Sequence, residues 1–265
     1  MINIAILGVC GKMGISMLSE LFSENDFKIS GGFDKINLGM DIGVLVGREI
    51  TGIKVTDKYE DLKSCAPDVI IDFTGPEVVY TNICWAIKNS INIIVGATGL
   101  SKDEIEDIKI KTTVSSSKVF IVPNFSIGAV VMMKLSQITA SFFENCEIIE
   151  KHHDNKKDAP SGTSIATAQA ISQKKKFNED RLKKNEIETL ESSRGSFYEG
   201  IHIHSIRLPG LLAHQSVIFG SKGQTLTIKH DSMDRSSFYP GLAMAIRSIN
   251  KLDNFTYGLE SILKF

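Results

Sequence analysis

Short apolar runs of strand length alternate with helical patterns through the first half of the chain. The runs are largely β-branched, as expected for strands buried on both faces of a parallel sheet. The intervening segments 78–88 and 102–111 have apolar positions at helical spacing. This alternation predicts an α/β fold with a Rossmann-type doubly wound parallel sheet. The strands are expected at residues 3–7, 27–33, 69–74, 93–99 and 119–125.

The second half of the chain has a different pattern, with two helices and then closely spaced alternating strands. Turns at Pro209-Gly210 and Lys222-Gly223 separate the last three strands. This pattern predicts a smaller α+β domain with an open mixed sheet. The helices are expected at residues 128–143 and 163–172, and the strands at 147–151, 201–207, 214–219 and 224–230.

Two domains are therefore expected. Residues 1–123 and 235–265 would form a dinucleotide-binding domain, to which the helical pattern at 236–249 returns. Residues 124–234 would form a substrate-binding and oligomerisation domain. Its open sheet would leave a broad apolar face in water, and association of identical chains through that face would bury it. Within it, the charged segment 174–196 is expected to be an exposed connection.

A glycine-rich turn joins the first predicted strand to the first helix. Gly8, Gly11 and Gly14 would let the backbone approach a pyrophosphate, whose charge the helix N-terminus stabilises. The second strand ends in Asp34, at roughly the 20-residue spacing of an acid that binds a ribose hydroxyl. The combination predicts a nicotinamide dinucleotide site. The alternative is that Asp34 is an ordinary turn residue.

The residue after Asp34 bears on the choice of nucleotide. An acid alone favours NADH, whereas the ammonium of Lys35 can neutralise the 2'-phosphate of NADPH. We therefore expect either NADH or NADPH to serve as cofactor. The alternative is that Lys35 is simply solvated, as surface lysines usually are.

Composition narrows the class of protein. Hydrophobic residues make up 42% of the 265 residues and charged residues 23%, so the chain can bury a sizeable core. A net charge of -1 argues against a nucleic-acid-binding face. No apolar run approaches the roughly 20 residues that span a bilayer, and the chain starts on a strand rather than a leader. A cytoplasmic enzyme without a membrane or nucleic-acid partner is expected.

The cysteines and histidines are the candidate metal ligands of the chain. The four cysteines lack the close pairing of a zinc knuckle, and we expect them to be reduced: Cys10, Cys65, Cys84 and Cys146. His202 and His204 would share one strand face and could join His152 and His153 around zinc. This alternative is disfavoured because no carboxylate or cysteine accompanies them at a recognisable metal spacing. No metal is expected.

The segment from Glu150 to Thr163 is the candidate reaction site. His152 can exchange protons near neutral pH, and Lys156 can donate a proton or attract an anion. The following helix, capped by Asp158 or Ser161, would offer backbone N–H groups to a carboxylate. A polar surface loop without function is the alternative.

These residues also carry a family resemblance. Glu-Lys-His-His at residues 150–153, with Lys156 and Asp-Ala-Pro-Ser-Gly-Thr at 158–163, resembles the signature of the 4-hydroxy-tetrahydrodipicolinate reductases. This family, also called the dihydrodipicolinate reductases, acts in bacterial lysine and diaminopimelate synthesis. Supporting motifs are the glycine turn at 8–14, Asp-Phe-Thr-Gly-Pro-Glu at 72–77, Gly-Ala-Thr-Gly at 96–99 and Asn-Phe-Ser-Ile-Gly at 124–128.

The resemblance implies a role for each matching residue. His152 and Lys156 would be the catalytic residues, the first a proton donor or acceptor and the second the proton donor. The carboxylates of the substrate would bind His153, Gly162 and Thr163. Cofactor contacts would come from Gly8, Val9, Cys10, Gly11, Lys12, Met13, Asp34, Lys35, Gly96, Ala97, Thr98, Val122, Pro123, Asn124 and Phe125.

The implied reaction is NAD(P)H-dependent reduction of a cyclic imine dicarboxylate, 4-hydroxy-tetrahydrodipicolinate, to tetrahydrodipicolinate with loss of water. The family also implies a homotetramer built on the sheet of the second domain. Departures from the family pattern are Asp34 for a frequent Glu, Lys35 for Arg and Gly75 for Arg, and they bear on cofactor preference. Two other classes stay open: a dehydrogenase acting on an amino acid or semialdehyde, and a non-catalytic cofactor sensor.

Overall fold

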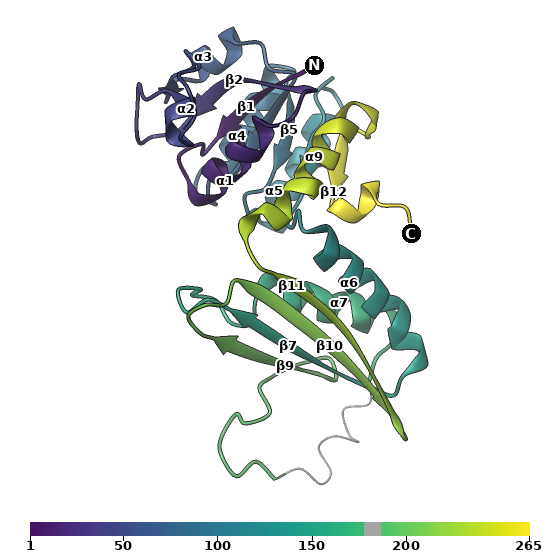
Figure 1. The fold of residues 1–265 in the computed structure, drawn as a ribbon. Coiled ribbons are helices and arrows are strands. Elements are labelled where there is room, and N and C mark those ends of the chain that lie inside the picture. The colour runs from purple at the N-terminus through teal and green to yellow at the C-terminus, as the bar shows by residue number, and fades with distance from the viewer. Residues whose placement is uncertain (178–186) are drawn as a thin grey trace. The chain divides into compact units, whose positions relative to one another are not determined.

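The computed structural model describes residues 1–177 and 187–265 (Figure 1). The chain divides into two compact units, Met1–Phe125 with Phe238–Phe265 and Ser126–Ser237, which are called unit 1 and unit 2 below. The sequence-based boundaries, 123/124 and 234/235, lie close to these. The middle of the expected connection at 174–196 falls outside the described residues, and its first residue, Lys174, ends a helix.

Unit 1 is built on a parallel sheet of seven strands in the order β12-β6-β5-β4-β1-β2-β3. Every pair in it is parallel, so the carboxyl ends of all strands lie along one edge. Its strands are β1 (Ile2–Leu7), β2 (Phe27–Phe33), β3 (Val55–Thr56), β4 (Val69–Asp72), β5 (Asn92–Val95), β6 (Val119–Ile121) and β12 (Phe255–Tyr257).

Helices cover both faces of this sheet. On one face, α3 (Tyr59–Ser64), α4 (Val79–Lys88) and α5 (Lys102–Thr112) share an apolar core with alternate strand residues such as Leu7, Ile70 and Ile93. The intervening strand residues, such as Ile6, are equally buried on the other face. There α1 (Lys12–Leu21) and α9 (Tyr239–Ser248) contact each other (Figure 1).

Unit 2 contains a mixed sheet of five strands in the order β11-β10-β7-β9-β8. The central pair β7–β9 is parallel and the other pairs are antiparallel. Its strands are β7 (Asn145–His152), β8 (Ser196–Tyr198), β9 (Ile201–Arg207), β10 (Ala213–Ser221) and β11 (Gln224–Ser232). The predicted fold class, a doubly wound sheet with a smaller α+β domain, is thus confirmed.

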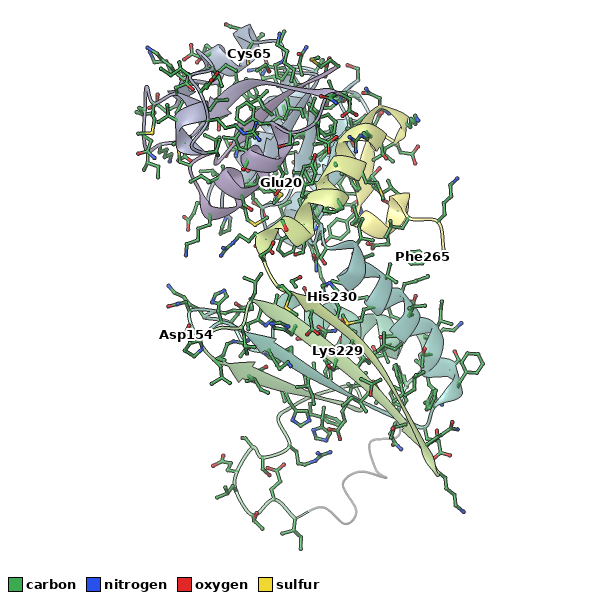
Figure 2. The ribbon with its side chains drawn as sticks, viewed as in Figure 1. Glu20, Cys65, Asp154, Lys229, His230 and Phe265 are labelled. Atoms are coloured by element: carbon green, nitrogen blue, oxygen red, sulfur yellow. The ribbon has the colours of Figure 1, made fainter. Side chains whose placement is uncertain are left out.

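One face of this second sheet is covered within the unit. There α6 (Ile127–Thr139), followed by η1 (Ala140–Phe142), and α7 (Gly162–Lys174) pack on alternate strand residues, including Ile148 and Val217. Adjacent residues of β11 have their side chains on opposite faces of the sheet (Figure 2). The side chain of His230 contacts Ser126 on the covered face, whereas that of Lys229 pairs with Asp231 on the open face.

Several predicted elements need correction at their ends. The strands predicted at 69–74, 93–99 and 119–125 end at Asp72, Val95 and Ile121. After Asp72 the chain turns because its carboxylate accepts hydrogen bonds from both the amide and the hydroxyl of Thr74. The helix predicted at 128–143 ends at Thr139, and that at 236–249 begins as the 3-10 helix η2 (Arg235–Phe238).

Some short elements were not predicted. They are α2 (Ile42–Leu45), β3, α3, β8, β12 and the 3-10 helices η3 (Ile249–Lys251) and η4 (Leu259–Ile262). Through β12, which pairs with β6, the C-terminal segment belongs to unit 1. No helix among the described residues is long and apolar enough to cross a bilayer.

Candidate active site

The glycine turn after β1 is closely packed. Gly8 has φ +76°, and a Cβ there would lie 2.8 Å from the backbone of Phe73, while a Cβ at Gly14 would overlap the Gly8 carbonyl oxygen. Glycine is therefore required at both positions. This crowding brings the start of α1 against the strand ends, the geometry in which a glycine turn holds a pyrophosphate.

Asp34 organises this turn from the end of β2. Its Oδ2 accepts a hydrogen bond from the amide of Cys10 at 2.9 Å, and its Oδ1 accepts from the amide of Lys35 at 2.7 Å. A carboxylate has about four acceptor positions, so Asp34 retains capacity to accept a ribose hydroxyl. Lys35 is exposed, and no hydrogen bond or ion pair of its side chain is found in residues 1–177 and 187–265.

Val9 and Cys10 are buried in the protein, whereas Lys12 at the end of the same turn is exposed. Val9 packs near Gly32. The amides of Lys12 and Met13 precede the first helical hydrogen bond of α1, from Ile15 N to Gly11 O. They are thus the donors at this helix start for a phosphate group.

The remaining predicted cofactor residues follow β5 and β6 along the same sheet edge. Gly96 is crowded by the rings of Phe73 and Phe125, which meet edge to face at 6.0 Å. Ala97 and Phe125 are buried. Thr98 and Pro123 are exposed, Asn124 is half-buried and Val122 is buried. The parallel strand order thus brings all the predicted cofactor positions to one edge of unit 1.

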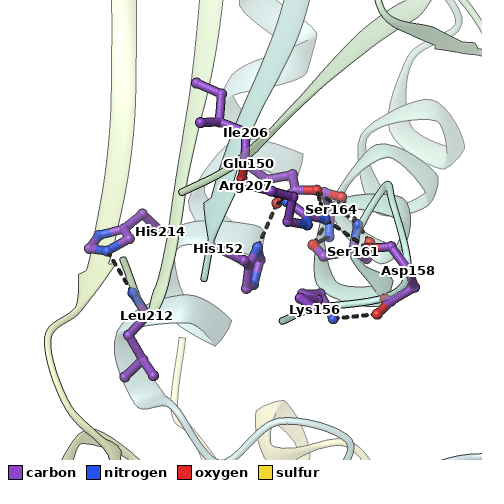
Figure 3. Close-up of polar contacts among 10 residues, drawn as sticks. All are labelled: Glu150, His152, Lys156, Asp158, Ser161, Ser164, Ile206, Arg207, Leu212 and His214. Atoms are coloured by element: carbon purple, nitrogen blue, oxygen red, sulfur yellow. Dashed lines mark hydrogen bonds and ion pairs between the residues drawn. The ribbon is translucent and has the colours of Figure 1, made fainter. Parts of the chain in front are cut away.

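Unit 2 contains a separate group of candidate site residues, at the point where β7 ends at His152. The Nδ1 atom of His152 is 2.5 Å from Oε2 of Glu150, a fully buried carboxylate (Figure 3). Arg207 on β9 forms a two-point ion pair with the same carboxylate, with Nη1–Oε2 at 2.8 Å and Nη2–Oε1 at 2.7 Å. The amide of Ser161 also donates to Oε1, at 3.2 Å.

These contacts determine the charge of Glu150. Burial alone raises the pKa of this carboxyl, but hydrogen bonds from His152 and Arg207 outweigh burial and lower the pKa to about 2. Glu150 is therefore ionised across the physiological pH range. Its partner Arg207 has a raised pKa because the carboxylate stabilises the guanidinium.

The loop from His153 to Pro160 carries Lys156. Its Nζ atom lies 2.8 Å from Oδ1 of Asp158, and the lysine side chain is 23% exposed. The backbone carbonyl of Asp158 accepts a hydrogen bond from Nη2 of Arg207 at 2.7 Å. His153 is half-buried, and its carbonyl accepts from the Lys156 amide in a tight turn.

The loop leads into the N-terminus of α7. Of the two predicted caps, Ser161 is the one found: its hydroxyl accepts from the amide of Ser164 at 3.2 Å, whereas Asp158 pairs with Lys156. The helix starts at Gly162, so the amides of Gly162 and Thr163 precede its first internal hydrogen bond. A helix start of this kind favours an anion such as a carboxylate.

The histidines do not converge on a metal. His204 bonds Glu147 at 2.8 Å, and His152 bonds Glu150. Because Glu147 and Glu150 are three positions apart on one strand, they lie on opposite faces of the sheet. In the described ranges, no group of three or more histidine, cysteine, aspartate or glutamate side chains is arranged to hold a metal ion.

Glu150 lies in the candidate segment predicted from the sequence, where it had no assigned role, and Arg207 was not predicted. Glu150 shares the buried parity of Cys146 and Ile148 on β7, so strand alternation was a usable signal of a buried charge. No local signal existed for Arg207, which is 57 residues further along the chain.

Two family models account for almost the whole chain. The model described as "Dihydrodipicolinate reductase, N-terminus" matches residues 2–125, and that described as "Dihydrodipicolinate reductase, C-terminus" matches residues 128–263. The chain belongs to the dihydrodipicolinate reductase family. The resemblance inferred from its motifs is confirmed.

Relatives that match this chain over almost its whole length support the family assignment. The chain is 39% identical over 264 residues to a protein of Carboxydothermus hydrogenoformans named 4-hydroxy-tetrahydrodipicolinate reductase, covering 99% of this chain and 100% of the relative. It is 42% identical over 262 residues to a protein of the same name from Streptococcus uberis, covering 99% of each.

Solved structures agree. Dipicolinate-bound dihydrodipicolinate reductase from Paenisporosarcina sp. TG-14 superposes with a TM-score of 0.86 at 37% identity, covering 99% of this chain and 100% of that one. An amine dehydrogenase from Mycobacterium smegmatis shares the fold, with a TM-score of 0.66 at 11% identity over 94% of this chain and 92% of that one.

Members of the dihydrodipicolinate reductase family are oxidoreductases, and the N-terminal family domain implies a nicotinamide nucleotide cofactor. The residues present fit such a group. Glycine is required where the backbone must be approached closely, the start of α1 offers amide donors, and an acid ends β2.

Proposed function

We propose that this protein catalyses the NAD(P)H-dependent reduction of 4-hydroxy-tetrahydrodipicolinate to tetrahydrodipicolinate, with loss of water, in lysine and diaminopimelate synthesis. The observation that carries the proposal is the grouping of His152, Lys156 and the start of α7 at one end of the unit 2 sheet. Proton-transfer groups beside an anion-binding helix start suit reduction of a carboxylated imine.

The substrate is a ring with two carboxylates. We assign its carboxylates to His153 and to the amides of Gly162 and Thr163, because a protonated ring nitrogen and a helix start both donate to anions. The dipicolinate bound to the Paenisporosarcina relative is a planar dicarboxylate, which supports this class of ligand.

Both NADH and NADPH are proposed as hydride donors. Asp34 is placed to accept from a ribose hydroxyl, which favours NADH, and the exposed ammonium of Lys35 is placed to neutralise a 2'-phosphate. Because Lys35 offers a single charged donor rather than the fork of an arginine, its contribution to NADPH binding should be screened by salt.

A bound reduced nicotinamide supplies the hydride for the reaction. Loss of the 4-hydroxyl group with a ring proton, as water, gives a conjugated imine. Hydride addition to this imine leaves electron density on the ring, and a nearby acid must neutralise it with a proton. Lys156 is placed to provide this proton from its ammonium group. His152 assists proton exchange through the ring nitrogen opposite Nδ1, since Nδ1 is held by Glu150.

The open face of the unit 2 sheet suggests how the protein assembles. It carries Ile149, Ile206 and Ile218 beside polar residues, and Ile206 is 38% exposed. A homotetramer formed through this face, with unit 1 as the nucleotide-binding domain, is part of the proposal. A cytoplasmic location is also part of the proposal.

The proposal is tested by following NADH and NADPH oxidation with the freshly generated product of dihydrodipicolinate synthase. Substrate-dependent oxidation is expected with at least one nucleotide, and none with amino acids or aspartate semialdehyde alone. Turnover of an amino acid with NAD+ or NADP+, or of aspartate semialdehyde with either form of the nucleotide, would instead identify a different dehydrogenase. Nucleotide binding without turnover of any of these compounds would identify a cofactor sensor.

A further inference from the structure

The buried carboxylate of Glu150 connects His152 to two other parts of unit 2. It receives His152 Nδ1 at 2.5 Å, both terminal nitrogens of Arg207, and the amide of the helix cap Ser161. Four hydrogen-bonding atoms from one helix start and two strands thus meet at one side chain that solvent does not reach.

The donors around Glu150 determine where the proton on His152 lies. A guanidinium and a backbone amide can only donate, so the Glu150 oxygens act as acceptors and the group is an anion. An anionic carboxylate requires a donor at Nδ1 of His152. Neutral His152 is then the Nδ1–H tautomer, and Nε2 is the atom that can exchange a proton.

Arg207 extends this arrangement to the second proposed catalytic residue. Its Nη2 atom donates both to Oε1 of Glu150 and to the backbone carbonyl of Asp158, each at 2.7 Å. The side chain of Asp158 in turn holds the ammonium of Lys156 at 2.8 Å (Figure 3). One guanidinium therefore ties the Lys156 loop to the strand that carries His152.

We propose that Glu150 and Arg207 are positioning residues of the reductase site. Glu150 keeps the proton of neutral His152 on Nδ1 so that Nε2 faces the reaction, and Arg207 fixes both Glu150 and the Lys156 loop. The inference deepens the proposed function and rests on it for its catalytic consequence, whereas the tautomer can be measured without turnover.

Glu150→Gln provides the sharpest test. Each carboxylate oxygen receives two hydrogen bonds, but Ser161 N and Arg207 Nη2 at Oε1 can only donate, whereas His152 at Oε2 can become an acceptor, so the amide oxygen of glutamine would take the Oε1 position. Its NH2 group would then face Nδ1 of His152 and donate to it. The proton of neutral His152 should move to Nε2, and kcat should fall by about 10- to 100-fold, as when the hydrogen-bonded support of a functional histidine is removed.

The tautomer is read from the imidazole 15N shifts of the full-length protein, together with kcat and the Kd of pyridine-2,6-dicarboxylate. We expect Nδ1–H in the wild type, Nε2–H in Glu150→Gln and little change in Kd. Glu147→Gln is the matched control, because Glu147 contacts His204 and Arg194 on the other sheet face, and it should leave the His152 shifts unchanged.

Arg207→Lys keeps the positive charge of residue 207 and provides a second test of the proposal that does not depend on the folding of Glu150→Gln. A lysine cannot bond both carboxylate oxygens and the Asp158 carbonyl, so the 153–160 loop should exchange amide hydrogens faster and kcat should fall. Arg247→Lys is its control: Arg247 forms a similar fork to Asp26, with distances of 2.8 and 2.9 Å, at the amino end of β2.

The inference is overturned if folded Glu150→Gln keeps the Nδ1–H tautomer, or if kcat of both variants equals that of the wild type. If the wild-type protein itself shows no reductase turnover, the proposed function fails. The tautomer and loop-exchange measurements would even then decide whether Glu150 and Arg207 position these residues.

Discussion

The Nζ atom of Lys156 lies 2.8 Å from Oδ1 of Asp158, two residues further along the same loop. Asp158 is more than half exposed, and ion pairs of this kind contribute only about 0–1 kcal/mol. The lysine can therefore leave the carboxylate for a substrate at little cost. Asp158 is better regarded as a resting partner of Lys156 than as its permanent one.

Replacing Lys156 tests its role as the proton donor. Lys156→Ala should lower kcat by about 10²-fold or more, the usual effect of losing a general acid, while NADH binding changes little. His153→Ala should instead raise KM, because this residue is assigned to substrate binding. Steady-state kinetics with both variants checks the assignment, and near wild-type turnover by Lys156→Ala would contradict it.

Lys35 is expected to decide how well the 2'-phosphate of NADPH is tolerated. Lys35→Ala should weaken NADPH binding more than NADH binding, and added salt should penalise NADPH selectively because the contact is exposed. Lys28→Ala, an exposed lysine near the amino end of the same strand, serves as the control. Equal losses for the two nucleotides in a fluorescence titration would show that Lys35 is only a surface residue.

The N-terminal cap of α7 links stability to substrate binding. Ser161→Ala removes the hydrogen bond to Ser164 N and should lower the unfolding free energy by about 1 kcal/mol. It should also weaken pyridine-2,6-dicarboxylate, because the amides of Gly162 and Thr163 would be less well ordered. Ser101→Ala removes an equivalent cap from α5 in unit 1. Calorimetric titration should show weaker dicarboxylate binding only for the Ser161 variant.

Glu150 should make the stability of the protein depend on pH. Its folded-state pKa of about 2 lies below the ordinary value of 4.5, so its stabilisation is present above pH 4.5 and is lost as the pH falls toward 2. About 2 kcal/mol should be lost between pH 6 and pH 3. Urea unfolding should therefore show the stability gap between wild type and Glu150→Gln narrowing by this amount. A gap independent of pH would contradict the ionised, paired state of Glu150.

The glycine turn offers a steric test of nucleotide binding. A Cβ at Gly14 would overlap the carbonyl oxygen of Gly8, so Gly14→Ala should displace the turn and abolish tight nucleotide binding. Gly220→Ala on β10 of unit 2 is the control, since a Cβ there meets nothing within 4 Å. Differential scanning fluorimetry with and without NADH measures both effects. An unchanged NADH-induced shift for Gly14→Ala would mean that the turn does not hold the nucleotide.

Local patterns were sufficient to predict much of unit 1. The strand at 27–33 matches β2 residue for residue, because an apolar run bounded by polar residues carries its own signal. The region between Asp34 and β4 was not predicted. There α2 and β3 are only four and two residues long, and the carboxylate of Asp41 holds the segment by accepting from the amides of Gly43, Thr51 and Gly52. Contacts of this kind leave no periodic pattern.

The candidate site was predictable where its residues are close in the sequence. His152, Lys156 and Gly162 lie on one short segment, and the structure gathers them around the end of β7 and the start of α7. The pairing of Glu150 with Arg207 depends on β7 and β9 being parallel neighbours, with His152 opposite Arg207. Strand order is a tertiary property, so this partner of Glu150 could not be predicted from local sequence patterns.

Reduction of 4-hydroxy-tetrahydrodipicolinate by this protein is tested most directly by tracing the transferred hydride with deuterium. NADH carrying deuterium at the transferable C4 position is incubated with the protein and freshly generated 4-hydroxy-tetrahydrodipicolinate, and the product is examined by mass spectrometry. We expect tetrahydrodipicolinate that carries one deuterium for each NADH oxidised. Oxidation of NADH without deuterium in tetrahydrodipicolinate, or no oxidation at all, would contradict it.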